Sequence, residues 1–148
     1  MGYTQYFFKI DDSIDFTKSE ILEFGKNVKK IIQKSGIKIK GPDGLGEPII
    51  NEKEVSFNGD ASKSEDHETF SVSNDMWGFC KTNRKAYDKV VVASIIAAKK
   101  VFKNKIEVDS DAHNINDVNE GIKLFIEAID DDNVNINVDE YLKDLNFS

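Results

Sequence analysis

The side chains best suited to chemistry lie in one short segment, residues 77–88, with the sequence WGFCKTNRKAYD. This segment contains the only tryptophan, the only cysteine and the only arginine of the chain, Arg84. It also places Lys81 and Lys85 directly before a long apolar run that is typical of a buried helix. Cations at the start of a helix oppose its dipole, at a cost of up to about 1 kcal/mol each. The pattern therefore favours a site for an anion.

The chemistry expected of this segment is recognition of a phosphate or carboxylate. Backbone N–H groups at a helix start and the Thr82 hydroxyl can donate hydrogen bonds to an anion. Arg84 can grip two of its oxygens at once, which lysine does poorly. A second interpretation stays open, because Asp88 and other acids could neutralise the cations. Arg84 could likewise bind an internal carboxylate such as that of Glu68 or Asp88.

Aromatic residues near the cations would suit a planar anionic ligand such as a nucleotide, which could stack on them while its phosphate is gripped. The alternative is that these rings belong to the core. The predicted ligand-binding residues are Lys81, Thr82, Arg84, Lys85, Tyr87, Asp88, Tyr3, Asn58 and Glu68.

No catalytic residue, metal site or cofactor is predicted. Cys80 lies beside Lys81 and close to a helix start, which would favour its thiolate. Its aromatic neighbours make a small buried hydrophobic residue the stronger interpretation. Residues 109–120 match several ligand positions of a calcium-binding EF-hand loop, but Asn114 replaces the required glycine, so we expect no calcium requirement. The acids beside His67 lack the spacing of a transition-metal site.

These residues must be positioned by elements that begin with a strand and a helix. Residues 3–10 alternate, are rich in aromatics, and are apolar enough to be largely covered on both faces of a strand. Thr17 and Glu20 form a capping-box pattern at the start of a helix, and Gly36 is placed to end it.

The middle of the chain is predicted to hold a loop, a hairpin and the core helix. Residues 41–48 contain both prolines and lack the ending of a phosphate-binding P-loop. Strands at 55–57 and 68–72 are expected to pair as an antiparallel hairpin, with a long connection between them. The apolar run predicts a buried helix over 86–103.

The C-terminal part is predicted to add a short strand at 106–109 and a third helix capped by Asn114 or Asn116. An acidic tail follows over about 130–148, with a short helix possible at 139–145. Strands and helices in this order predict a single α+β domain over 1–148, a small antiparallel sheet packed by about three helices, one of them central and buried.

Charge and composition narrow the function classes. The chain has 148 residues and a net charge of −7, which disfavours a general nucleic-acid or anionic-membrane binder. A single cysteine excludes an internal disulfide and fits a reducing cytoplasm. The longest apolar run, residues 90–98, is far shorter than the roughly 20 residues that cross a bilayer, and no signal peptide is recognised.

Four stretches resemble an uncharacterised family of small phage and bacterial proteins: residues 2–7 (GYTQYF), 57–59 (FNG), 68–70 (ETF) and 79–88 (FCKTNRKAYD). Members of that family typically open with GYTHYW and carry FCKTxRKPYD. The resemblance covers about residues 2–122, and this chain departs from it at Gln5, Phe7 and Ala86, where the family has His, Trp and Pro. It implies a phage or prophage protein of the host cytoplasm, and no reaction.

Three functions remain open at the level of sequence. The first is a binding protein that holds an anionic small ligand, nucleotide-like, and could sequester a signal of host defence. The second is a small enzyme acting on a phosphorylated substrate, and the third is a module that binds a host protein through its acidic surface. The basic cluster favours the first, and the lack of a persuasive catalytic set disfavours the second.

Overall fold

The structure of the protein, a computed structural model, describes residues 4–75, 78–110, 118–129 and 143. Within these residues the chain is an α+β domain, as the sequence predicts. Its elements, with η for a short 3-10 helix, are β1 (Thr4–Lys9), α1 (Lys18–Ser35), η1 (Pro42–Gly44), β2 (Ile49–Ile50), β3 (Glu54–Phe57), η2 (Ala61–Lys63), β4 (Phe70–Ser73), β5 (Gly78–Lys81), α2 (Asp88–Phe102), η3 (Lys103–Lys105), β6 (Ile106–Ser110) and α3 (Asn119–Ala128).

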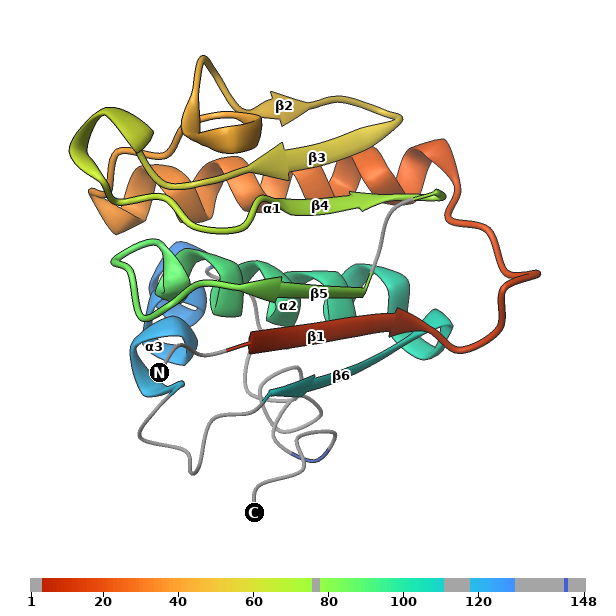
Figure 1. Cartoon of the computed structure of the whole chain (residues 1–148). Helices are drawn as coiled ribbons and strands as arrows, with labels where there is room; N and C mark the ends of the chain where they lie inside the picture. Colours follow the sequence, from red (N-terminus) through yellow and green to blue (C-terminus); the bar gives the residue numbers. More distant parts are fainter. Residues whose placement is uncertain (1–3, 76–77, 111–117, 130–142, 144–148) are drawn as a thin grey trace.

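The strands form two antiparallel sheets, where the sequence predicted one. One sheet has the order β5-β1-β6 and the other β2-β3-β4. The predicted hairpin is confirmed by the pairing of β3 with β4, which places Val55 opposite Val72. β1 pairs with β5 and β6, so both of its edges are filled and it cannot join the hairpin. Figure 1 shows α1 behind the β2-β3-β4 sheet and α2 behind the other sheet.

Helix α1 begins and ends where the sequence predicts. The Glu20 N–H donates to the Thr17 hydroxyl at 3.0 Å, and the Thr17 N–H donates to the Glu20 carboxylate at 2.8 Å. Gly36 ends the helix in a left-handed conformation with φ of 68°. Both ends of α1 are therefore set by residues at those ends, through hydrogen bonds at the start and the conformation of Gly36 at the finish. Its buried face consists of Ile21, Phe24, Gly25, Asn27, Val28 and Ile31.

Helix α2 is the core helix, and it spans 88–102 within the predicted range. Twelve of its fifteen residues are buried, so the expected burial on nearly every side is confirmed. α1, α3 and the β5-β1-β6 sheet all pack against it. Lys99 is buried near its C-terminal end, and its ammonium donates to the Ile106 carbonyl oxygen at 2.9 Å. That hydrogen bond offsets the desolvation of the charge.

Helix α3 packs closely on α2 because Gly121 has no side chain. A Cβ built on Gly121 would lie 2.4 Å from Val92 Cβ and 3.2 Å from the Lys89 carbonyl oxygen. The helix starts after Val118. The predicted caps Asn114 and Asn116 lie outside the described residues, as does the tail apart from Lys143.

Strand β1 turns its more polar face toward the core. Gln5, Phe7 and Lys9 are buried, whereas Phe8 and Ile10 are exposed. The expectation that both faces of the strand would be largely covered is therefore wrong for the outer face, where Phe8 and Ile10 are exposed. The inner face can hold polar residues because each finds a partner from a distant part of the chain.

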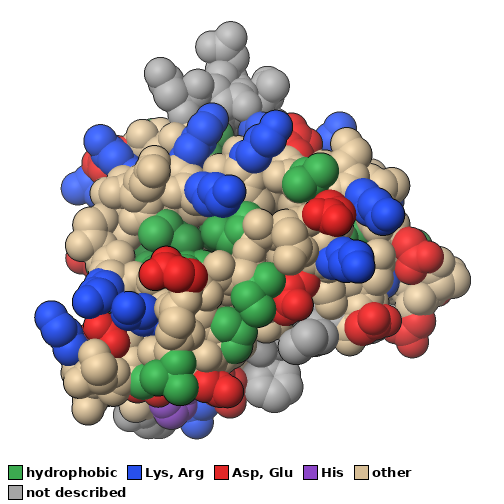
Figure 2. Space-filling view, turned by 90° about the horizontal axis from the view of Figure 1, so that it is seen from above, with side chains coloured by type: hydrophobic (Ala, Val, Ile, Leu, Met, Phe, Trp, Pro, Cys, Tyr) green, Lys and Arg blue, Asp and Glu red, His purple; other side chains and the backbone are tan. Residues whose placement is uncertain are grey.

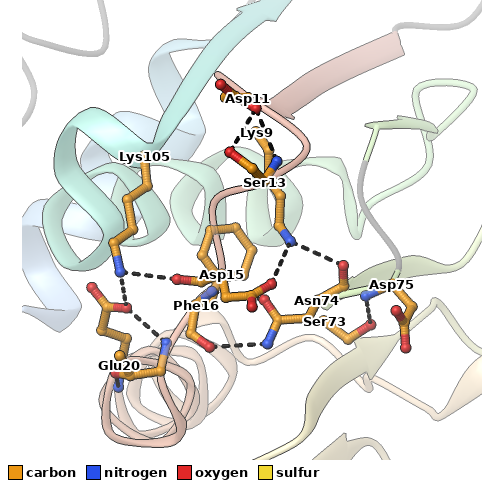
Figure 3. Close-up of polar contacts among 11 residues, drawn as sticks. Lys9, Asp11, Ser13, Asp15, Phe16, Glu20, Ser73, Asn74, Asp75 and Lys105 are labelled. Atoms are coloured by element: carbon orange, nitrogen blue, oxygen red, sulfur yellow. Dashed lines mark hydrogen bonds and ion pairs between the residues drawn. The ribbon is translucent and has the colours of Figure 1, made fainter.

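A cluster of polar contacts accounts for the buried Lys9 (Figure 3). Its ammonium donates to the Asn74 carbonyl oxygen at 3.0 Å and lies 3.7 Å from the Asp15 carboxylate. It also lies 5.0 Å from the centroid of the Phe16 ring. The Asn74 amide binds both backbone groups of Phe16, accepting at 2.7 Å and donating at 2.9 Å. These contacts tie the β1–α1 connection to the end of β4, and so join the two sheets.

The face seen from above has hydrophobic side chains gathered in a hollow near its centre, with basic side chains along one border (Figure 2). A groove of about 390 Å³ lies between α1 and residues 47–50, and Ile32, Ile39 and Ile50 line it. Among the described residues, no helix combines the length and the apolar character needed to cross a membrane.

Candidate functional site

The predicted site residues that follow β5 form a tight turn. The Lys85 N–H donates to the Thr82 carbonyl oxygen at 3.0 Å, and the two residues between them, Asn83 and Arg84, have φ of 52° and 60°. Two positive φ values in succession are typical of a type I′ turn, in which glycine is favoured at the second central position. Arg84 occupies that position at a cost of about 1 kcal/mol. The turn therefore carries an arginine where the backbone favours glycine.

Asp88, the first residue of α2, anchors this turn. Its Oδ1 accepts a short hydrogen bond from the Thr82 hydroxyl and one of 3.3 Å from Gln5 Nε2. The carboxylate also complements the positive end of the helix dipole. Asp88 thus joins β1, the turn and α2, and it supplies part of the neutralisation that the alternative interpretation of the sequence assigned to it.

The hydrogen-bond donors at the start of α2 are less available to a ligand than the sequence predicts. The Asp88 N–H donates to the Lys85 carbonyl oxygen at 2.9 Å, and the Val90 N–H donates to the Tyr87 carbonyl oxygen at 3.0 Å. A hydroxyl has one proton to donate, and that of Thr82 goes to Asp88. An anion at this turn would therefore be held mainly by cationic side chains.

Glu68 connects β5 to the start of α2. Its carboxylate accepts the Lys81 N–H at 2.6 Å, and its own N–H donates to the Lys81 carbonyl oxygen at 3.2 Å. The Tyr87 hydroxyl donates to the Glu68 carbonyl oxygen at 2.7 Å, and the Cys80 thiol donates to the same oxygen at 3.4 Å. Tyr87 is fully buried, so its ring belongs to the core and supports the turn from behind. Stacking of a ligand on this ring is not available.

Cys80 has the environment of a structural cysteine. Burial raises the pKa of its thiol above the ordinary value, and the negative charges of Glu68 and Asp88 raise it further. Burial likewise raises the pKa of Tyr87. A thiol that keeps its proton is a poor nucleophile. The suggestion that Lys81 would favour the thiolate is therefore wrong, and the buried hydrophobic interpretation is supported.

The cations differ in how they are placed. Lys81 and Arg84 are exposed, and Lys85 is half-buried. The Lys85 ammonium donates to the Ser64 carbonyl oxygen at 2.9 Å, which ties the turn to the loop before β4. Lys81 and Arg84 therefore bring positive charge to the surface on a turn whose backbone is held from several sides.

Two of the predicted residues lie further from the turn. Asn58 is buried, and its Nδ2 donates to the His67 carbonyl oxygen at 3.0 Å and to Thr69 Oγ1 at 3.1 Å. These hydrogen bonds hold the segment that carries Glu68, so the role of Asn58 is to position that segment. Tyr3 lies outside the described residues.

The sequence did not single out Gln5 as part of this site. Gln5 is buried, donates to Asp88, and has an Oε1 atom without a hydrogen-bond partner. The signal that could have found it is the alternation of residues 3–10, which places Gln5 on the same face as Phe7. A polar residue on a buried strand face calls for a polar partner.

Among the residues that the structure describes, no group of three or more His, Cys, Asp or Glu side chains could hold a metal ion. Part of the calcium-loop match at 109–120 lies outside them. No family model, curated protein or solved structure matches the chain.

Proposed function

We propose that the protein binds an anionic small molecule, nucleotide-like in character, at the turn between β5 and α2, without altering it chemically. The observation that carries this proposal is the left-handed conformation of Arg84, with φ of 60°. Glycine would relieve that strain, so the presence of arginine favours a function for its side chain. Recognition of a phosphate is the function that arginine performs better than any other residue.

The roles divide between contact and support. Arg84 contacts two oxygens of the ligand, and Lys81 and Lys85 add positive charge beside it. The remaining residues hold the turn and do not touch the ligand: Thr82, Asp88, Glu68, Tyr87 and Asn58.

Binding is favoured over catalysis because the carboxylates of Glu68 and Asp88, which a small enzyme could use as a base, are engaged in the protein's own hydrogen bonds. Glu68 accepts a backbone N–H of Lys81, and Asp88 accepts the Thr82 hydroxyl. A base must reach a substrate proton to act on it. Positive charge at the turn also favours a small anion over a host protein that would bind through an acidic surface.

The resemblance to a phage family extends the proposal to a cellular role. A phage or prophage protein in the host cytoplasm would bind a nucleotide signal of host defence and remove it from solution. A cationic turn on a chain of net charge −7 suits such a small anion better than a nucleic-acid polymer, which the whole surface would repel.

The test is a thermal-shift screen of wild-type protein against mononucleotides, cyclic dinucleotides and inorganic phosphate, since a ligand of the native state raises the melting temperature. The informative variant is Arg84→Gly. Its matched control is Lys103→Gly, because Lys103 is also exposed and cationic and also has a positive φ, 52°. Lys103 follows the far end of α2, and the helix places it about 22 Å along its axis from Asp88, where the helix begins.

Both glycine variants should unfold at or above the wild-type temperature, because each places glycine at a position with a positive φ. Only Arg84→Gly should lose the ligand-induced shift, and Arg84→Lys should lose part of it although the charge is kept. If Arg84→Gly binds the ligand as well as wild type does, the turn is not the binding site.

A further inference from the structure

The groove between α1 and residues 47–50 has an apolar interior that the proposed ligand site does not use. Its volume is about 390 Å³, and Ile32, Ile39, Pro48 and Ile50 supply its apolar surface. Ile39 is buried, whereas the other three are only half-buried. The face that Figure 2 shows has hydrophobic side chains gathered in such a hollow. Apolar surface that folding leaves in a hollow is suited to the side chains of a partner.

The walls of the groove are held in place by the fold. Gly25 lets β2 approach α1 closely, since a Cβ built on Gly25 would lie 2.7 Å from Ile50 Cγ2. The segment that carries Ile39 is tied to the end of β3, because Lys40 and Asn58 exchange two backbone hydrogen bonds of 2.9 Å. The groove is therefore preformed, which lowers the entropic cost of binding.

A stripe of α1 extends the surface beyond the groove. Leu22, Lys26, Lys29 and Gln33 are spaced i, i+4, i+7 and i+11, so they share one face of the helix. Lys29 and Gln33 line the groove. Leu22 is 46% exposed and lies about 10 Å further along the helix. The stripe thus offers a second apolar contact in line with the groove, with two lysines between them.

The charges on the two walls differ. Lys29 lines the groove on the α1 side, and Lys26 is exposed on the same stripe, whereas the opposite wall carries Glu47. Acidic groups of a partner would be attracted to the α1 side. A second copy that docked through its own α1 would instead bring lysines to this border. Like charges therefore disfavour self-association through α1.

The backbone beside the groove favours a helix over an added strand. β2 has only two residues, Ile49 and Ile50, and Pro48 before it has no N–H to donate to a neighbouring strand. A helix satisfies its own backbone hydrogen bonds and can enter a groove with side chains alone. Apolar residues at i, i+3 or i+4, and i+7 of such a helix lie on one face.

We propose that this groove docks an amphipathic helix of a partner protein, with its apolar face in the hollow and acidic residues along α1. One apolar anchor contacts Ile32, Ile39 and Ile50, and another covers Leu22. The acidic flank lies beside Lys26 and Lys29. This interaction is separate from ligand binding at the Arg84 turn, since the two surfaces share no residue.

The test is fluorescence anisotropy of the full-length protein with two synthetic helical peptides. Both carry leucine at i, i+4 and i+7, and one has glutamate on a flank where the other has lysine. Wild type should bind the glutamate peptide at least about threefold more tightly, since each exposed ion pair contributes up to about 1 kcal/mol. The double variant Lys26→Glu, Lys29→Glu should reverse that preference.

The matched control for charge is Lys34→Glu, Lys123→Glu, which makes the same change in net charge at exposed positions that do not line the groove. It should keep the wild-type preference, because solvent screens distant charges. An equal reversal in this control would overturn the proposal, as would the failure of wild type to bind either peptide with a Kd below about 1 mM.

A second pair of variants tests the apolar interior. Ile32→Thr should weaken the glutamate peptide about fivefold through loss of apolar contact. Its control is Leu45→Thr, which removes a leucine that is 66% exposed and does not line the groove, and should change binding less than twofold. Unchanged binding in folded Ile32→Thr would contradict the proposal. The lysine variants alter only exposed side chains, so their result stands even if Ile32→Thr is unstable.

Sedimentation of the wild-type protein distinguishes a partner helix from a second copy. The protein should stay monomeric at the concentrations used for the peptides. A dimer that Ile32→Thr dissociates and Leu45→Thr leaves intact would show that the groove is an interface between copies of this chain, and the proposal would fail.

Discussion

Substitution of Gly121 by alanine tests how tightly α3 is seated on the core helix. The added Cβ would lie 2.4 Å from both Cβ and Cγ1 of Val92 and 3.2 Å from the Lys89 carbonyl oxygen. Carbon atoms in contact are normally about 3.5–4.0 Å apart, so the helices must separate by about 1 Å or more. Val92 Cβ is fixed to the backbone, and no rotation of its side chain relieves the overlap.

The magnitude follows from two opposing effects. Overpacking of this kind costs about 1–3 kcal/mol, and the fixed obstacle places Gly121→Ala toward the upper end. Alanine recovers about 1 kcal/mol through its higher helix propensity. The net loss should be about 2 kcal/mol. For a chain of this length that lowers the melting temperature by about 4–8 °C.

The assay is equilibrium unfolding in urea followed by circular dichroism, with calorimetry for the melting temperature. The matched control is Gly25→Ala in α1, which gains the same helix propensity. Its Cβ would meet Ile50 Cγ2 at 2.7 Å, and rotation about χ1 of Ile50 can move that methyl group away. Gly25→Ala should therefore be close to wild type. A Gly121→Ala protein at least as stable as the control would refute the close seating of α3.

Three further predictions test the core, the cysteine and the first helix. Ile95→Asp should abolish the cooperative unfolding transition in circular dichroism, because it buries an unpaired charge in α2; a folded variant would contradict the core assignment. Cys80 should resist alkylation at pH 8 until the protein is unfolded, because burial raises the pKa of its thiol; labelling of the native protein would count against its burial. Burial raises the pKa of Glu20, but hydrogen bonds and charge from Lys105, with hydrogen bonds from Thr17, outweigh it, and the net pKa lies below the usual 4.5. A lowered pKa stabilises the fold above the unfolded value, and that contribution is lost as pH falls through the folded value, so Glu20→Gln should cost about 0.5 kcal/mol at pH 7 after solvent screening and progressively less as pH falls below 4.5; a cost that does not change with pH would contradict the pairing.

The sequence by itself determined the elements whose causes are local. The limits of α1 follow from Thr17, Glu20 and Gly36, which act within one turn of the helix ends. The burial of α2 follows from an apolar run that leaves no polar face. The β3–β4 hairpin follows from two short alternating segments. In each case the residues that decide the outcome are close together in the chain.

Parts of the candidate site were also readable from sequence, because their unusual residue types are clustered in residues 79–88. The structure brings Glu68, Lys81, Thr82, Tyr87 and Asp88 together around the turn. What the sequence misjudged was their use. The Thr82 hydroxyl and the Tyr87 ring serve the fold, and the left-handed conformation of Arg84 depends on the turn around it.

Tertiary structure alone decided the features that depend on partners far away in the chain. Lys9 meets Asn74 across 65 residues, and Gln5 meets Asp88 across 83, so a strand with two polar residues on its inner face is stable. The division into two sheets has the same origin. Periodicity reports which face of an element is apolar, but a polar group becomes tolerable in the core only when folding brings it a hydrogen-bond partner, and that meeting is a property of the whole chain.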